Sequence, residues 1–244
     1  MPLSIRNISP GDEAASETTL WKYLTFEKFL DFLLMKRLYF RRADKLTDPF
    51  ECLVPPEVCM GDPADGTPQA EREFLAAHES YINSARTKVF LNSWHTNEHE
   101  SEAMWKLFGG AGHSLAIRST LGRITSRLAG HDLTAGKVLY KDMVRDDCVI
   151  SDIFDFALLK RKPFEHEREF RLIFINEGGD DNPRLLDSFG LHIPVEPADI
   201  VDRIYVSPLS EPWQFELTQS IITRQGLSDR LIRSTLFNFP GMKR

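Results

Sequence analysis

The sequence predicts an α+β fold, with a mixed or antiparallel central sheet of short strands and with flanking helices. Two observations predict it. About seven or eight short segments are rich in aromatic and β-branched residues, which is typical of strands. Helical patterns lie between them at irregular intervals, unlike the regular alternation of a doubly wound fold. We expect a loose N-terminal arm over residues 1–18 and a single domain over residues 19–244.

The first expected helix lies between two short strands. Residues 20–24 have an alternating pattern of side chains and include two aromatic ones, which favours a strand. Thr25 is a favoured N-cap, and apolar residues then recur at helical spacing over 26–36. A second strand is expected over 38–40, before the Asp48-Pro49 turn.

Residues 52–68 contain four prolines and two glycines and are expected to form a surface loop. Strands and helices alternate after this loop, with strands at 89–94 and 113–118 and helices at 70–85, 100–108 and 121–128. Gly109-Gly110-Ala111-Gly112 follows a helix and lacks the spacing of a phosphate-binding loop, so we interpret it as a helix stop.

The second half is expected to be richer in strand. A helix is predicted over 146–160, because Asp146 begins it and Lys160 ends it, which complements the helix dipole. A helix over 211–225 is expected near the end. The strands of this half are expected at 136–143, 169–175, 189–193 and 203–206.

Composition excludes several classes of function. Of 244 residues, 42% are hydrophobic and 27% charged, which is ordinary for a soluble globular protein. The net charge of -6 argues against broad binding to nucleic acid. The most apolar run, 29–35, is too short to span a bilayer, and we expect a cytoplasmic protein without a signal peptide.

Cysteines and histidines predict no metal site. Three cysteines without CxxC spacing indicate a reducing compartment with neither disulfides nor zinc. His95 and His99 are four residues apart, but His95 ends an expected strand rather than lying on a helix. We therefore expect no metal cofactor.

The stretch 160–175 begins as a charged turn and continues as a strand. Alternation along a strand would place Glu167, Glu169 and Arg171 on one face. Two neighbouring carboxylates repel, which raises the pKa of one of them, and the arginine offsets that repulsion. The pattern fits a solvated strand end or a carboxylate pair held over a cleft for chemistry, and composition does not decide between them.

Six motifs in order resemble those of a large microbial family, the domain-of-unknown-function family 2971. The resemblance covers about residues 20–222. The motifs are Leu20-Trp21-Lys22-Tyr23, Arg37-Leu38-Tyr39-Phe40, Asp48-Pro49-Phe50-Glu51, Asn92-Ser93-Trp94, Met104-Trp105-x-x-Phe108 and Lys162…Glu167-x-Glu169-x-Arg171. The name of that family implies no activity.

The layout is more distantly similar to that of ADP-ribosyltransferases. Those enzymes have a basic residue on the first strand, an aromatic or serine-containing strand, and a late strand that opens with Glu-x-Glu. The resemblance implies that Glu169 and Glu167 are catalytic and that NAD is the substrate. It assigns NAD binding to Lys22, Tyr23, Tyr39, Ser93 and Arg171. Lys22 stands where arginine or histidine is usual in those enzymes.

The implied chemistry breaks the bond between nicotinamide and ribose. This builds positive charge on the ribose, which a fixed carboxylate stabilises. Glu169 would take that role by binding a ribose hydroxyl, and Glu167 would orient or deprotonate the acceptor. Lys22 would meet a phosphate as a point charge, and Tyr39 would stack on nicotinamide.

Two functions remain open. The first is an ADP-ribosyltransferase or another NAD-consuming enzyme, such as a toxin or phage-defence effector, whose acceptor is protein, DNA, RNA or water. The second is a catalytically inactive module of the same fold that binds a nucleotide or a protein. Under the first, Glu169→Gln is expected to abolish turnover and leave the fold intact.

Overall fold

The computed structural model describes residues 3–8, 16–56, 67–110, 112–143, 145–146, 148, 150–178, 185–187 and 189–238. It confirms an α+β chain with both parallel and antiparallel strand pairs. Contacts within the chain group into two compact units, which are described one at a time. Unit 1 comprises residues 1–8, 39–93 and 129–193, and unit 2 comprises residues 9–38, 94–128 and 194–244. The expectation of a single domain stays a prediction.

Unit 1 is built on antiparallel strands around β9, Glu169–Ile175. Strand β6, Thr134–Lys137, pairs with β9 on one side, and β4, Val89–Thr96, is its neighbour on the other. The first five residues of β4 belong to unit 1 and pair there with the end of β3, Arg37–Arg42. Four further strands of this unit are short: β7 Leu139–Lys141, β8 Leu159–Arg161, β10 Leu185–Asp187 and β11 Gly190–Pro194, the last residue of which falls in unit 2.

The N-terminal segment contains a strand where the sequence predicts a loose arm. Residues Ser4–Arg6 form β1, which pairs in parallel with β6. The Arg6 guanidinium binds the carboxylates of Asp152 and Asp155, with Nη2 lying 2.5 Å from Asp152 Oδ2. These ion pairs attach β1 to the helix that follows Asp152.

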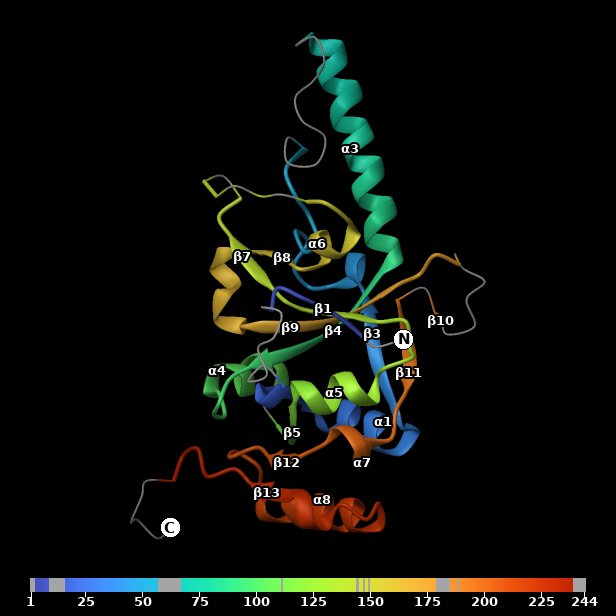
Figure 1. The fold of residues 1–244 in the computed structure, drawn as a ribbon. Coiled ribbons are helices and arrows are strands. Elements are labelled where there is room, and N and C mark those ends of the chain that lie inside the picture. Colours follow the sequence, from blue (N-terminus) through green and yellow to red (C-terminus); the bar gives the residue numbers. More distant parts are fainter. Residues whose placement is uncertain are drawn as a thin grey trace. The chain divides into compact units, whose positions relative to one another are not determined.

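The predicted bounds of the helix over 146–160 are wrong. The helix here, α6, spans only Ile153–Ala157. The Asp152 side chain accepts hydrogen bonds from the backbone N–H groups of Phe154 and Asp155. Asp152 is therefore the N-cap, and the helix begins at Ile153 rather than at Asp146. Lys160 lies on β8, which pairs in parallel with β7. In Figure 1, β7, β8 and α6 lie together on one side of β9.

Helix α3, Pro68–Lys88, is longer than predicted and projects from the rest of the described part of unit 1 (Figure 1). Thr67 caps its first turn, and Pro68 occupies the first helical position. Only His78, Ile82 and Ala85 are buried. These residues recur at helical spacing. Ile82 and Ala85 belong to the unit 1 core, and His78 Nε2 is hydrogen-bonded to the Val54 carbonyl, so the C-terminal half of the helix anchors it. The predicted loop over 52–68 lies mostly outside the described residues.

Unit 2 is built on the antiparallel pair β2, Thr19–Thr25, and β5, Ser114–Thr120, which match over seven residues. Strand β12, Arg203–Val206, pairs antiparallel with β5, and β13, Leu231–Arg233, pairs in parallel with β12. The end of β4 pairs with β2. The helices of this unit are α1 Phe26–Met35, α4 Glu102–Met104, α5 Leu121–Arg127, α7 Pro197–Ile200 and α8 Pro212–Arg224.

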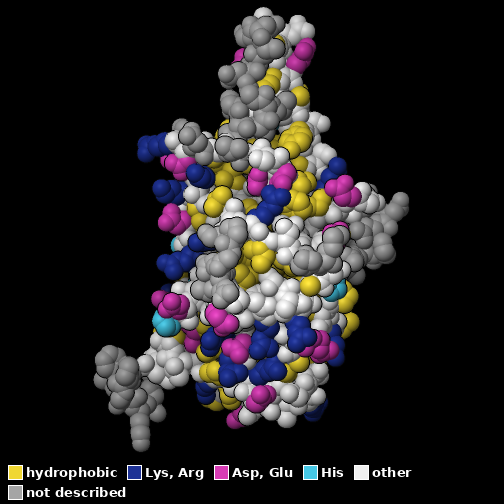
Figure 2. Space-filling model, viewed as in Figure 1, with side chains coloured by type: hydrophobic (Ala, Val, Ile, Leu, Met, Phe, Trp, Pro, Cys, Tyr) yellow, Lys and Arg dark blue, Asp and Glu magenta, His cyan; other side chains and the backbone are white. Residues whose placement is uncertain are grey.

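Aromatic side chains cover one face of the unit 2 sheet. Trp21, Tyr23 and Ala116 pack there against Met104 and Trp105. Trp105 begins a π-helical turn, η3, that ends at Gly109, so the predicted helix over 100–108 is present in an irregular form. Figure 2 shows lysine and arginine side chains over the part of unit 2 near α5 and β12, with acidic side chains among them. Within the described ranges, no helix is both long and apolar enough to cross a membrane.

Candidate functional site: a buried charge cluster in unit 1

The residues assigned to one site by the resemblance fall into both units. Unit 1 contains Glu167, Glu169 and Arg171 close together, and it also contains Tyr39 and Ser93. The two others, Lys22 and Tyr23, belong to unit 2.

Glu169 is the first residue of β9, and its side chain is enclosed by cations. Its carboxylate Oε1 accepts a hydrogen bond from Lys160 Nζ at 2.6 Å, and Oε2 accepts one from Arg171 Nε at 2.9 Å. Glu169 and Arg171 share a face of the strand, as alternation predicts. Only 5% of Glu169 is exposed, so both oxygens are taken up by neighbours inside the protein.

Glu51 and Lys160 complete the arrangement, although the sequence did not indicate them as partners. Arg171 donates to Glu51 Oε1 at 2.7 Å and to the backbone carbonyl of Ala157 at 2.7 Å. Lys160 Nζ lies 3.2 Å from Glu51 Oε2 and 2.9 Å from Glu167 Oε2. Glu51 is the last residue of the Asp48-Pro49-Phe50-Glu51 motif, and this motif was the sequence feature that could have pointed to it. We call Glu51, Lys160, Glu167, Glu169 and Arg171 the charge cluster.

The pKa shifts follow from this geometry. Burial would raise the pKa of Glu169, but the positive charges of Arg171 and Lys160 hold that pKa well below its usual range. Burial would likewise lower the pKa of Lys160, but Glu169 and Glu51 raise it. The cluster therefore holds Glu169 ionised and Lys160 protonated around neutral pH.

Glu167 differs from Glu169. It ends η4, a 3-10 segment over Lys162–Glu167, and is separated from β9 by Arg168 in a left-handed conformation. Its side chain is 13% exposed. Burial raises the pKa of Glu167, and the negative charge of Glu169 raises it further, while Lys160 opposes both. Of the two predicted catalytic carboxylates, Glu167 is the one with the properties of a general acid or base.

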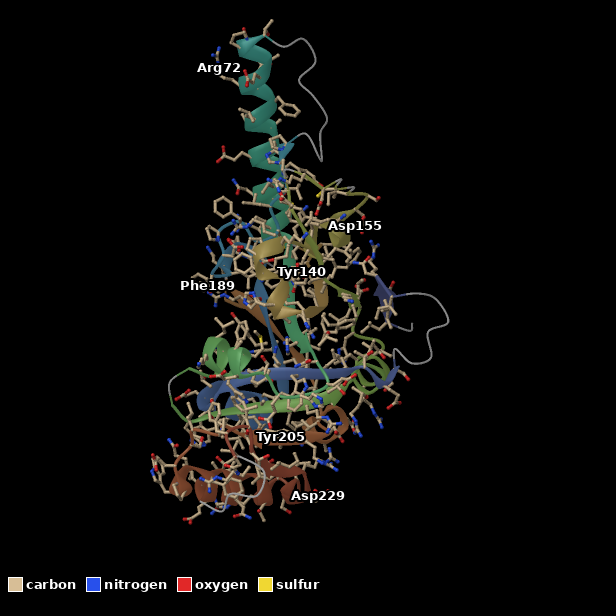
Figure 3. All side chains as sticks on the ribbon, turned by 90° about the vertical axis from the view of Figure 1, so that its left-hand side faces the viewer. Arg72, Tyr140, Asp155, Phe189, Tyr205 and Asp229 are labelled. Carbon is tan, nitrogen blue, oxygen red and sulfur yellow. The ribbon has the colours of Figure 1, made fainter. Side chains whose placement is uncertain are left out.

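Aromatic side chains border the charge cluster. Phe164 lies 4.9 Å from Lys160 Nζ, measured to the ring centroid. The Tyr140 hydroxyl accepts a hydrogen bond from the backbone N–H of Glu169 at 2.8 Å, and Figure 3 shows Tyr140 beside η4. Burial, and then the charge of Glu169, raises the pKa of Tyr140.

A second layer ties the Asp48-Pro49-Phe50-Glu51 motif to β8. Arg161 Nη2 donates to both oxygens of Asp48, at 3.0 and 3.2 Å. Its guanidinium also lies over the Phe50 ring, 4.6 Å from the centroid. Cys52 follows the motif and belongs to the unit 1 core, and its burial raises the pKa of its thiol to about 12.

Tyr39 and Ser93 lie elsewhere in unit 1. The Tyr39 ring packs edge-on against His192, with 5.4 Å between centroids, and its hydroxyl donates to the Phe189 carbonyl at 3.4 Å. A Cβ atom on Gly190 would lie 2.4 Å from this ring, so glycine is needed beside it. Ser93 is exposed on β4.

Lys22 and Tyr23 point to opposite faces of β2 in unit 2. Lys22 Nζ lies 5.4 Å from the centroid of the Trp94 ring. Tyr23 is buried, and its hydroxyl accepts a hydrogen bond from the Ser101 N–H at 2.8 Å. Burial raises the pKa of Tyr23. The role in NAD binding that the resemblance implies for these two side chains stays a prediction.

Comparisons with known proteins add no relative. No family model matches the chain, and no match is found among curated proteins or solved structures. The two resemblances therefore stay predictions. In the described ranges, no group of three or more histidine, cysteine or acidic side chains is arranged to hold a metal ion.

Proposed function

We propose that this chain is a nucleotide-binding module in which Glu169 stabilises unit 1 and performs no chemistry. One observation carries the proposal: both oxygens of the Glu169 carboxylate are bound by cations inside the protein. A carboxylate that stabilises positive charge on a ribose must present an oxygen to it. Here that would require Glu169 to leave Lys160 or Arg171. We infer that the ligand is a nucleotide from the similarity in layout to ADP-ribosyltransferases, which is an analogy.

A second candidate is an enzyme that consumes NAD, with Glu167 as its catalytic residue. Its raised pKa and its partial exposure favour it. In this scheme Lys160, Glu169 and Arg171 position Glu167 and do not touch the substrate. The role as a toxin or phage-defence effector belongs to this candidate.

Nicotinamide release and NAD binding by the purified chain separate the two candidates. We expect NAD to raise the midpoint of thermal unfolding without release of nicotinamide, alone or with cell extract. Release that Glu167→Gln abolishes would overturn the binding module in favour of the enzyme. If NAD, AMP and ADP-ribose all leave the midpoint unchanged at millimolar concentration, the proposal of nucleotide binding fails.

Glu167→Gln needs a matched control, and Glu165→Gln supplies it. Glu165 lies on η4 two positions away and is exposed. Glu169→Gln is less suitable than Glu167→Gln as the main variant. The substitution removes the charge that neutralises Lys160 and Arg171, so a loss of activity would also follow from a loss of stability.

A further inference from the structure

Helix α8 of unit 2 has two faces of different character. Its inner face is buried through Thr218 and Ile222, neither of which is exposed to water. In Figure 1 and Figure 3, β5 and β12 lie on the same side of α8. On its outer face Trp213 is 61% exposed and Leu217 is 42% exposed. A tryptophan so exposed is uncommon, because the large ring is usually buried.

The outer face of α8 carries a stripe with the spacing of a coiled-coil seam. Its four exposed members follow one another at steps of four, three and four residues: Trp213, Leu217, Ser220 and Arg224. Residues at alternating steps of three and four lie along one line of a helix, as the a and d positions of a heptad do. We call these four residues the α8 seam. Their spacing is the one that lets a second helix lie along α8.

The helix that carries the α8 seam is held firmly by its neighbours. A capping box joins Glu211 and Gln214 at its N-terminus, and Pro212 occupies the first helical position. On the other side of the helix, the Arg233 guanidinium lies over the Phe215 ring, 5.5 Å from its centroid. A surface that is already ordered loses little entropy when it binds a partner.

The charges of the α8 seam select one orientation for a second copy of the helix. In a parallel pair each residue meets its own copy, so two Arg224 side chains would face each other and repel. In an antiparallel pair the order is reversed, so Trp213 meets Arg224 of the second copy, which is a favourable cation–π contact. Leu217 then meets the small Ser220 side chain. Glu216 is exposed beside the seam, about one turn from that guanidinium, and can form an ion pair with it.

We propose that α8 is the interface of a homodimer, in which the α8 seams of two copies pack antiparallel about a two-fold axis. Such a contact is self-complementary and closes at two copies. A helix of 13 residues is about 20 Å long, so the contact is smaller than a standard interface. We therefore expect a weak dimer, with a dissociation constant on the order of 10 µM. This inference does not depend on the proposed nucleotide binding.

Sedimentation velocity of the full chain between about 1 µM and about 300 µM tests the proposal, because this range brackets the expected dissociation constant. We expect monomer at the lower limit and dimer at the upper. Leu217→Glu is expected to leave the chain monomeric throughout, because it would bury two carboxylates in the contact. Leu34→Glu is the matched control, since Leu34 is 48% exposed on α1 of the same unit and lies outside the seam. Circular dichroism and the thermal midpoint establish that each variant is folded.

The orientation has a test of its own. Arg224→Lys keeps the positive charge and supplies an amine, which a carbodiimide joins to a carboxylate in contact with it. In a mixture of isotope-labelled and unlabelled chains, we expect a cross-link between position 224 of one copy and Glu216 of another. Arg224→Glu is expected to weaken the dimer at least about tenfold, because its carboxylate would face the Trp213 ring and Glu216.

Three results would overturn the proposal. Wild type that stays monomeric at about 300 µM would show that α8 is not a dimer interface, because the expected affinity predicts dimer there. A dimer that Leu217→Glu weakens no more than Leu34→Glu does would place the interface elsewhere. A dimer that gives no cross-link between positions 224 and 216, and that Arg224→Glu leaves intact, would exclude the antiparallel arrangement.

Discussion

Unit 1 and unit 2 each contain a group of arginines and carboxylates, but they use them in opposite ways. In unit 1, Arg171 is almost fully buried and donates to Glu169, Glu51 and a backbone carbonyl. In unit 2, Arg224 is exposed on α8, and its guanidinium makes no ion pair or hydrogen bond among the described residues. Charged groups whose hydrogen bonds are all made inside the protein hold a fold together. Charged groups at the surface that still have hydrogen-bonding capacity can bind a partner. A pair of glutamates in the sequence is therefore weak evidence for a catalytic site. The hydrogen bonds that their carboxylates already make inside the protein are stronger evidence.

The largest effect is expected from breaking the charge cluster. Arg171→Met leaves Glu169 and Glu51 buried with Lys160 as their only cation in the cluster. Removing one partner of a buried pair costs roughly 3–5 kcal/mol, so we expect a loss of that size in the free energy of unfolding. Urea unfolding measures it. A loss below about 1 kcal/mol would mean that the cluster contributes little and would return Glu169 to the list of candidate catalytic groups.

Acid is expected to weaken unit 1 through the same cluster. Because the pKa of Glu169 is lowered in the folded state, its contribution to stability is present above about pH 4.3, the ordinary value for glutamate, and is lost as the pH falls below it. The raised pKa of Glu167 has the opposite sign and offsets part of this loss. Urea unfolding of wild type and Glu169→Gln between pH 7 and pH 3 tests the prediction, and we expect the difference between the two to shrink as the pH falls. A constant difference would contradict the assignment of the lowered pKa to Glu169.

A smaller effect is expected in unit 2 when one buried polar group is removed. Tyr23→Phe deletes the hydroxyl that accepts from the Ser101 N–H and leaves the ring packed against Trp105. We expect a loss of about 1 kcal/mol in the free energy of unfolding, since one neutral hydrogen bond is removed and the apolar packing stays. Nucleotide affinity measured on the same variant sharpens the comparison. A large loss of affinity with unchanged stability would show that Tyr23 binds the ligand itself, as the resemblance to ADP-ribosyltransferases implies.

Local patterns predicted most of the elements and part of the site. Alternation along a strand was sufficient to place Glu169 and Arg171 side by side, since the two are neighbours on one face. The same pattern wrongly included Glu167, which ends η4 before the strand begins. The partnership with Glu51 was not predictable in this way, because it joins residues far apart in sequence. Lys160 was assigned to a helix end because a lysine there complements the helix dipole. The Asp152 cap shortens that helix, and β8 then turns the Lys160 side chain into the cluster.

The separation of Glu51 from Arg171 has a consequence for how the chain acquires its structure. The two residues are 120 positions apart, and the segments of unit 1 are interrupted in sequence by those of unit 2. During synthesis Glu51 is made long before its arginine partner, so its carboxylate stays in water until β9 emerges. Contacts of such long range close slowly, because the entropy of a long loop must be lost before they form. We therefore expect Glu51 to join the cluster after Lys160, Glu169 and Arg171, which are close to one another in sequence.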